Sequence, residues 1–85
     1  MYSIGGILMK QFHIWMRSFE DIQAFVKLAS KQTFDIIVGP DDQDISAKSL
    51  MAMLGINFRR PVRVRMNCDD TEFARFQLAA ARFLA

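Results

Sequence analysis

The sequence has 85 residues, of which 52% are hydrophobic, and this composition excludes a disordered chain. A formal net charge of +2 is too mild for a nucleic-acid-binding domain, which usually carries a clustered basic face. The single cysteine excludes an internal disulfide and agrees with a cytoplasmic location, and no apolar run is long enough to predict a membrane span. We interpret residues 1–8 as a lead or an extra strand and residues 9–85 as one domain.

The first predicted elements are a strand over residues 10–17 and a helix that begins at Ser18. The strand alternates, which predicts one buried face made of Phe12, Ile14 and Met16. Asp21 lies three residues after Ser18, a capping-box pattern, and the helix ends near Lys31. Its apolar stripe consists of Ile22, Phe25, Val26 and Ala29.

A hairpin is predicted next, with strands over residues 33–38 and 43–46. Residues 39–42 read Gly-Pro-Asp-Asp, which is dense in turn-forming types. In the first strand of the hairpin, Ile37 is expected to face outward, and the alternate residues are expected to face the core. That inward set is Phe34, Ile36 and Val38.

A short amphipathic helix is predicted over residues 47–54. Ser46 is expected to cap it, because its hydroxyl can accept from a free amide of the first turn. Gly55 fits the left-handed position that closes a helix. Ser49 then lies in the first turn, near the positive end of the helix dipole, where a phosphate would be favoured.

The last predicted elements are a strand over residues 62–66 and a helix capped by Asp69, with Glu72 three residues on. The apolar stripe of that helix is Phe73, Phe76, Ala80 and Phe83. The element order is β-α-β-β-α-β-α, and each strand buries one face. We therefore expect an α+β fold with a mainly antiparallel sheet covered on one side by helices.

The uncovered sheet face has an unusual composition for a solvated surface. An exposed tryptophan beside arginines is typical of interfaces, so the face is a candidate for partner docking or weak homodimerisation. Arginine stacking on the tryptophan within one molecule is the alternative. The residues expected on this face are His13, Trp15, Ile37, Arg63 and Arg65.

Residues 45–55, Ile-Ser-Ala-Lys-Ser-Leu-Met-Ala-Met-Leu-Gly, resemble the regulatory-serine segment of HPr, the histidine-containing phosphocarrier of the bacterial sugar phosphotransferase system. The resemblance extends over about residues 12–84. It implies an open-faced β-sandwich with strand order 1-4-2-3 and three helices on one face. It also implies that Ser49 is a kinase target, and that the same helix meets partners through Lys48, Met51 and Met53. Core filling is the alternative role for the two methionines.

The resemblance also locates a phosphocarrier site that has lost its acceptor. The family carries its phosphorylated histidine in a Gly-Leu-His-x-Arg-Pro pattern at the start of the first helix, and Met16-Arg-Ser-Phe-Glu-Asp21 lies over that pattern here. Ser18 takes the histidine position, Glu20 the arginine position and Asp21 the proline position. A phosphoryl group at Ser18 is expected to meet two carboxylates rather than a cation.

No other chemistry is predicted. His13, the one histidine, is either a displaced phosphoryl acceptor or an ordinary solvated strand residue. One histidine and one cysteine exclude a zinc site, and no P-loop or dinucleotide motif predicts a cofactor.

Three functions follow as hypotheses, none of them enzymatic. The first is an HPr-like regulatory or protein-binding module without the phosphorylatable histidine. Its partner would be a phosphotransferase-system component, an HPr kinase or a transcription regulator. The alternatives are a phosphocarrier with a non-standard acceptor, and a structural or oligomerisation domain that uses the open sheet face.

Overall fold

The computed structural model describes residues 9–39 and 43–85. The interpretation of residues 1–8, and the turn at residues 40–42, lie outside this part of the chain. The elements are β1 (Met9–Ile14), α1 (Phe19–Ser30), β2 (Ile36–Val38), β3 (Ile45–Ser46), α2 (Leu50–Met53), β4 (Val62–Asn67), α3 (Asp70–Ala79) and the 3₁₀ helix η2 (Ala81–Phe83).

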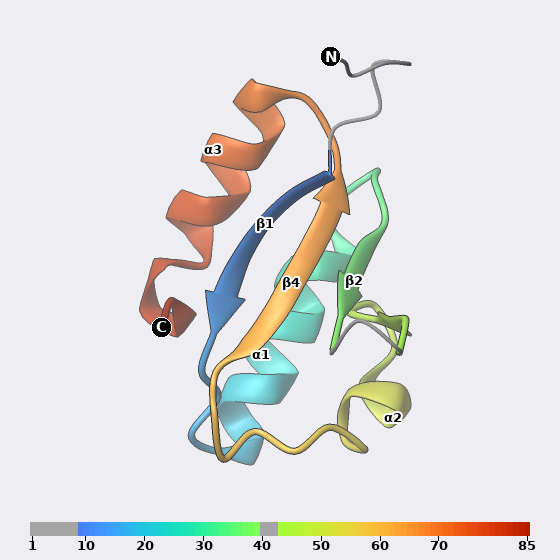
Figure 1. The fold of residues 1–85 in the computed structure, drawn as a ribbon, viewed down its shortest axis with the longest axis vertical. Coiled ribbons are helices and arrows are strands. Elements are labelled where there is room, and N and C mark those ends of the chain that lie inside the picture. Colours follow the sequence, from blue (N-terminus) through green and yellow to red (C-terminus); the bar gives the residue numbers. More distant parts are fainter. Residues whose placement is uncertain (1–8, 40–42) are drawn as a thin grey trace.

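The four strands form one antiparallel sheet in the order β1-β4-β2-β3 (Figure 1). β4 lies centrally, with His13 of β1 opposite Arg63 and Ile37 of β2 opposite Arg65. The predicted α+β class and the strand order 1-4-2-3 are both confirmed. The strands of the hairpin are shorter than predicted, since β2 begins at Ile36 and β3 at Ile45.

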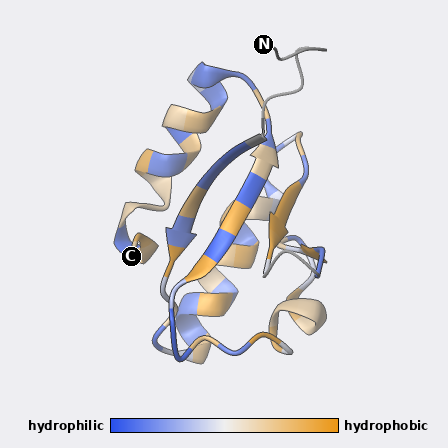
Figure 2. Ribbon diagram, in the orientation of Figure 1, coloured by the Kyte–Doolittle hydropathy of each residue, from blue (hydrophilic) through white to orange (hydrophobic). Residues whose placement is uncertain are grey.

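The helices cover one face of the sheet, and α1 passes behind it in Figure 1. The predicted alternation is confirmed, because Val62, Val64 and Met66 are buried while the arginines between them are partly exposed. Figure 2 shows this alternation as bands of opposite hydropathy along β4. The sheet therefore has one apolar face under the helices and one face open to solvent.

Phenylalanine rings join the helices to the sheet. Phe76 of α3 is 1% exposed and lies within 5.9–6.3 Å, between ring centroids, of three other rings. One ring comes from β1, one from α1 and one from the segment before β2, namely Phe12, Phe25 and Phe34. Phe76 is therefore the point at which α3, α1 and the sheet meet.

The C-terminal segment differs from the predicted single helix. α3 begins with the predicted capping box of Asp69 and Glu72 but ends at Ala79, and Phe83 lies in η2 instead. Beyond that point the chain runs beside β1. The Trp15 amide donates to the Phe83 carbonyl at 2.7 Å, and the Ala85 amide donates to the His13 carbonyl at 3.0 Å.

The short helix α2 corrects two predictions. Ser46 does not cap it, because Ser46 is paired with Ile37 and the next amide, that of Ala47, still bonds to the Ile36 carbonyl at 2.8 Å. The chain is thus bound to β2 where the helix was expected to begin. Gly55 is not left-handed either: Leu54 closes the helix in a right-handed conformation.

Candidate functional site

The N-terminal end of α1 carries the residues that the sequence marked as a degenerate phosphocarrier site. Ser18 is the N-cap, as predicted, with an extended backbone and a hydroxyl that accepts from the Asp21 amide at 3.2 Å. In a capping box the Asp21 carboxylate would also accept from the backbone amide of the cap residue, Ser18, but here the donor is one residue earlier. The Asp21 carboxylate accepts from the amide of Arg17 at 3.1 Å, rather than from that of Ser18.

Asp21 also links the start of α1 to the 3₁₀ helix η2 near the C-terminus. Its second carboxylate oxygen accepts from the Arg82 guanidinium at 3.0 Å, across 61 positions of sequence. The Arg17 amide, and then the Arg82 guanidinium, hold the pKa of Asp21 below its usual value of 3.8. Asp21 is therefore an ionised structural anchor and a weak base.

Arginines lie near this site in addition to the expected carboxylates of Glu20 and Asp21. Besides Arg82, the Arg17 guanidinium lies 4.7 Å from the ring centroid of Trp15, a cation–π geometry. Arg59, from the segment before β4, lines the same hollow as Ser18. Sequence inspection missed Arg59 and Arg82 because both reach the site from distant segments.

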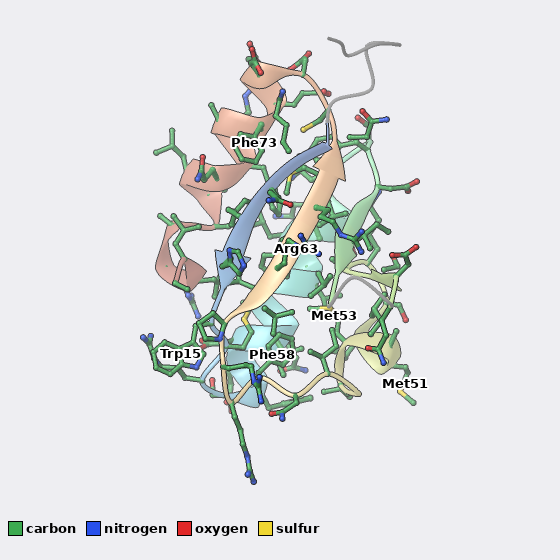
Figure 3. All side chains as sticks on the ribbon, viewed as in Figure 1. Trp15, Met51, Met53, Phe58, Arg63 and Phe73 are labelled. Carbon is green, nitrogen blue, oxygen red and sulfur yellow. The ribbon has the colours of Figure 1, made fainter. Side chains whose placement is uncertain are left out.

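A shallow hollow of about 540 Å³ opens beside Ser18, and we name it the α1 hollow. Figure 3 shows the labelled side chains of Trp15 and Phe58 at this end of the molecule. Trp15 is 39% exposed. The α1 hollow is lined chiefly by Trp15, Arg17, Ser18, Ile56, Phe58 and Arg59.

His13 does not belong to this hollow. It lies in β1 opposite Arg63, with an exposed side chain on the open sheet face. No helix N-terminus is among the residues that line the cavity beside it. The structure thus separates the only histidine from Ser18.

The α2 region carries the second set of predicted site residues. Ser49 is the N-cap of α2 rather than a residue of its first turn, and its hydroxyl accepts from the Ala52 amide at 3.3 Å. Met51 is 81% exposed and points away from the body of the protein in Figure 3. Met51 is thus available to a partner.

Lys48 and Met53 were predicted for the same partner surface. Both instead make contacts within the protein. Met53 is completely buried in the core, so its place on a partner surface was a wrong prediction. Its position on α2 turns it toward the sheet, whereas Met51 is turned away. Lys48 is half-buried, and its ammonium donates to the Gln32 carbonyl at 2.9 Å, just beyond the end of α1. This bond fixes α2 against α1 and satisfies a free carbonyl.

The open sheet face brings together four of the five residues expected there. His13 lies beside Arg63, and Ile37 beside Arg65. The Arg65 guanidinium donates to Asp44 at 2.8 Å and to the Gln43 carbonyl at 3.3 Å, so it ties β4 to the start of β3. Trp15 is the exception, because it lies past the end of β1 and stacks on Arg17.

Comparison with known proteins finds a similar fold but no similar sequence. No protein-family model and no curated protein matches the sequence. A phosphocarrier protein HPr from Bacillus anthracis str. Ames superposes with a TM-score of 0.65, over 95% of this chain and 100% of that one. The fold is HPr-like. At 18% sequence identity, this likeness establishes the architecture and no more.

The described residues of this HPr-like fold form no metal site and no activated cysteine. They contain no group of three or more histidine, cysteine or acidic side chains that could hold a metal ion. Cys68 is half-buried, and burial, followed by the nearby Glu72 carboxylate, raises the pKa of its thiol. A raised pKa lowers the thiolate fraction, so Cys68 is a poor nucleophile. None of the described helices has the length and apolar character needed to cross a bilayer.

Proposed function

We propose that this chain is a non-catalytic HPr-like module that binds a protein partner at the α1 hollow and does not relay phosphoryl groups. The observation that carries the proposal is the geometry of Ser18. The resemblance aligns this residue with the family's phosphorylated histidine, and here it is a helix cap whose hydroxyl accepts from a backbone amide. A cytoplasmic, bacterial setting and the absence of enzymatic activity are part of the proposal.

The chemistry at Ser18 disfavours a relay. A serine hydroxyl needs a neighbouring general base to become nucleophilic. Asp21 is poorly suited to that role, because its carboxylate is bound to the Arg17 amide and the Arg82 guanidinium and its pKa is lowered. A phosphoserine ester is also too stable to pass its phosphoryl group on, whereas a phosphorylated imidazole is labile.

The composition of the α1 hollow supports a docking role. Exposed aromatic side chains and arginines are enriched where proteins bind one another. Trp15 and Phe58 supply apolar area, while Arg17 and Arg59 supply charge. A partner that fits this surface would present an apolar side chain flanked by carboxylates.

The experiment is incubation with enzyme I of a phosphotransferase system and labelled phosphoenolpyruvate, with a functional HPr as the positive control. We expect label on HPr and none on this chain. Acid-labile label on this chain would overturn the proposal. Its loss in His13→Ala, with retention in Ser18→Ala, would identify His13 as the acceptor.

That outcome is the second candidate function, a phosphocarrier with a non-standard acceptor. One observation favours it: His13 shares a cavity with Arg60 and Arg63, and arginines stabilise a phosphoryl group. We rank it second because His13 lies on a strand, away from the helix amides that would hold the phosphate.

A further inference from the structure

A second concavity opens on the side of the sheet that no helix covers, where β4 begins. Its volume is about 410 Å³, within the range of small-molecule sites. Its walls come from β1, from the segment before β3, from the segment after α2 and from the first residues of β4. We name it the β4-entry cavity, and its principal lining residues are His13, Gln43, Ile56, Asn57, Arg60 and Arg63.

Among the described residues, the polar groups that line this cavity are cationic or neutral. No described residue that lines it is acidic. Within the described part of the chain, the side chains of His13 and Arg60 have no hydrogen bond or ion pair, whereas Arg63 already has an interaction of its own. The side-chain oxygen of Asn57, Oδ1, accepts from the Arg59 amide at 3.0 Å, which leaves the side-chain NH₂ group as a donor.

The cavity wall is held in place from outside. Arg65 bonds to the Gln43 carbonyl and to the Asp44 carboxylate, so the wall residue Gln43 is fixed to β4. The same ion pair occupies the nearby Asp44 carboxylate, which would otherwise add negative charge beside the cavity. Val62, which is buried, and Ile56, which is partly buried, provide apolar surface between the polar groups.

We propose that the β4-entry cavity binds a small phosphorylated metabolite, a phosphomonoester of a sugar or polyol. The phosphate would bind Arg60, whose planar guanidinium matches phosphate geometry, with His13 as a second donor. Asn57 would donate to a hydroxyl group, and the carbon skeleton would lie against Ile56 and Pro61. The β4-entry cavity shares Ile56 with the α1 hollow, but the proposed phosphate contacts, Arg60 and His13, do not line that hollow.

The test is titration of the isotopically labelled full chain, followed by amide NMR, with glucose 6-phosphate as the probe. We expect saturable shifts centred on residues 55–57 and 60–63. Glucose, inorganic phosphate and glucuronate are the comparison ligands, and each should bind at least about tenfold more weakly. Equal binding of inorganic phosphate would reduce the site to an adventitious anion contact, and equal binding of glucuronate would overturn the assignment to phosphate.

The matched variants are Arg60→Gln and Arg75→Gln. Both residues are exposed arginines, but Arg75 lies on α3, outside the cavity. Arg60→Gln should weaken glucose 6-phosphate binding by about tenfold or more, the loss expected for one charge-assisted contact, and Arg75→Gln by less than about twofold. Equal losses would show general charge attraction and overturn the proposal, as would the absence of saturable shifts. If Arg60→Gln fails to fold, His13→Gln, at an exposed strand position, carries the same expectation.

Discussion

Replacing Phe76 by leucine should destabilise the protein by about 2 kcal/mol. Leucine keeps most of the buried apolar area but loses the ring contacts to Phe12, Phe25 and Phe34, whose centroids lie 5.9–6.3 Å away. Each aromatic pair in this range contributes about 0.5–1.5 kcal/mol beyond its area, and three pairs that share one ring are not fully additive. Alanine would cost about 3–5 kcal/mol, a large share of the stability of a domain of this size.

Urea denaturation followed by far-UV circular dichroism measures this change. Because the urea m-value of so small a domain is about 1 kcal/mol/M, the midpoint should fall by about 2 M. Thermal unfolding should shift by about 8–16 °C. Leu78→Ala is the matched control on the same helix: Leu78 is 79% exposed, so the expected change is within about 0.5 kcal/mol. If Phe76→Leu and Leu78→Ala shift the midpoint equally, the assignment of Phe76 as the junction of the core is wrong.

The remaining predictions concern charge, association and modification. The pKa of Asp21 is lowered on folding, so its contribution to stability is present above the usual carboxyl pKa and is lost as pH falls through the folded pKa. In Asp21→Asn, the free energy of unfolding, measured by urea denaturation, should therefore fall less steeply as the pH is lowered. An unchanged fall at acid pH would contradict this. Because Trp15 is exposed in the α1 hollow rather than on the open sheet face, self-association would use the hollow, and sedimentation at rising concentration should show weak association that Trp15→Ala reduces; a monomer at high micromolar concentration would refute it. If an HPr kinase and ATP phosphorylate this chain, peptide mass mapping should place the phosphate on Ser49, and label retained in Ser49→Ala would count against that site.

Much of this fold was predictable because the sheet is covered on one side only. Period-two alternation is then unambiguous in β1 and β4, and the caps at Ser18 and Asp69 mark where α1 and α3 begin. The strand order was implied by the family resemblance and not by the pattern itself.

The errors at α2 arose from competition between local and long-range bonds. Ser46 and Ser49 are equally good caps in isolation. The bond from the Ala47 amide to the Ile36 carbonyl decides between them, and that bond is a property of the sheet rather than of the local sequence. The error at Met53 has a different cause: two positions along a helix separate nearly opposite faces, so Met51 and Met53 cannot both face outward, and here Met53 is the buried one.

At the α1 hollow, only the contacts between residues that are close in sequence were predictable. Ser18 and Asp21 are neighbours in sequence, and their hydrogen bond follows from helix capping. The approach of Arg82 to Asp21 across 61 positions, and of Arg59 to the α1 hollow, depends on how the chain returns to this end of the molecule. No local sequence pattern encodes those contacts.

The path of the C-terminal residues has a consequence for how copies of the protein behave in solution. Within residues 9–39 and 43–85, β1 is an outer strand of the sheet, and the backbone groups along its outer side form a template onto which another chain could add. Residues 83–85 occupy part of that template through the bonds to Trp15 and His13. At the opposite side of the sheet, β3 has only two residues and offers little to pair with. The last residues therefore protect against edge-to-edge aggregation, and an affinity tag for expression is better placed away from them.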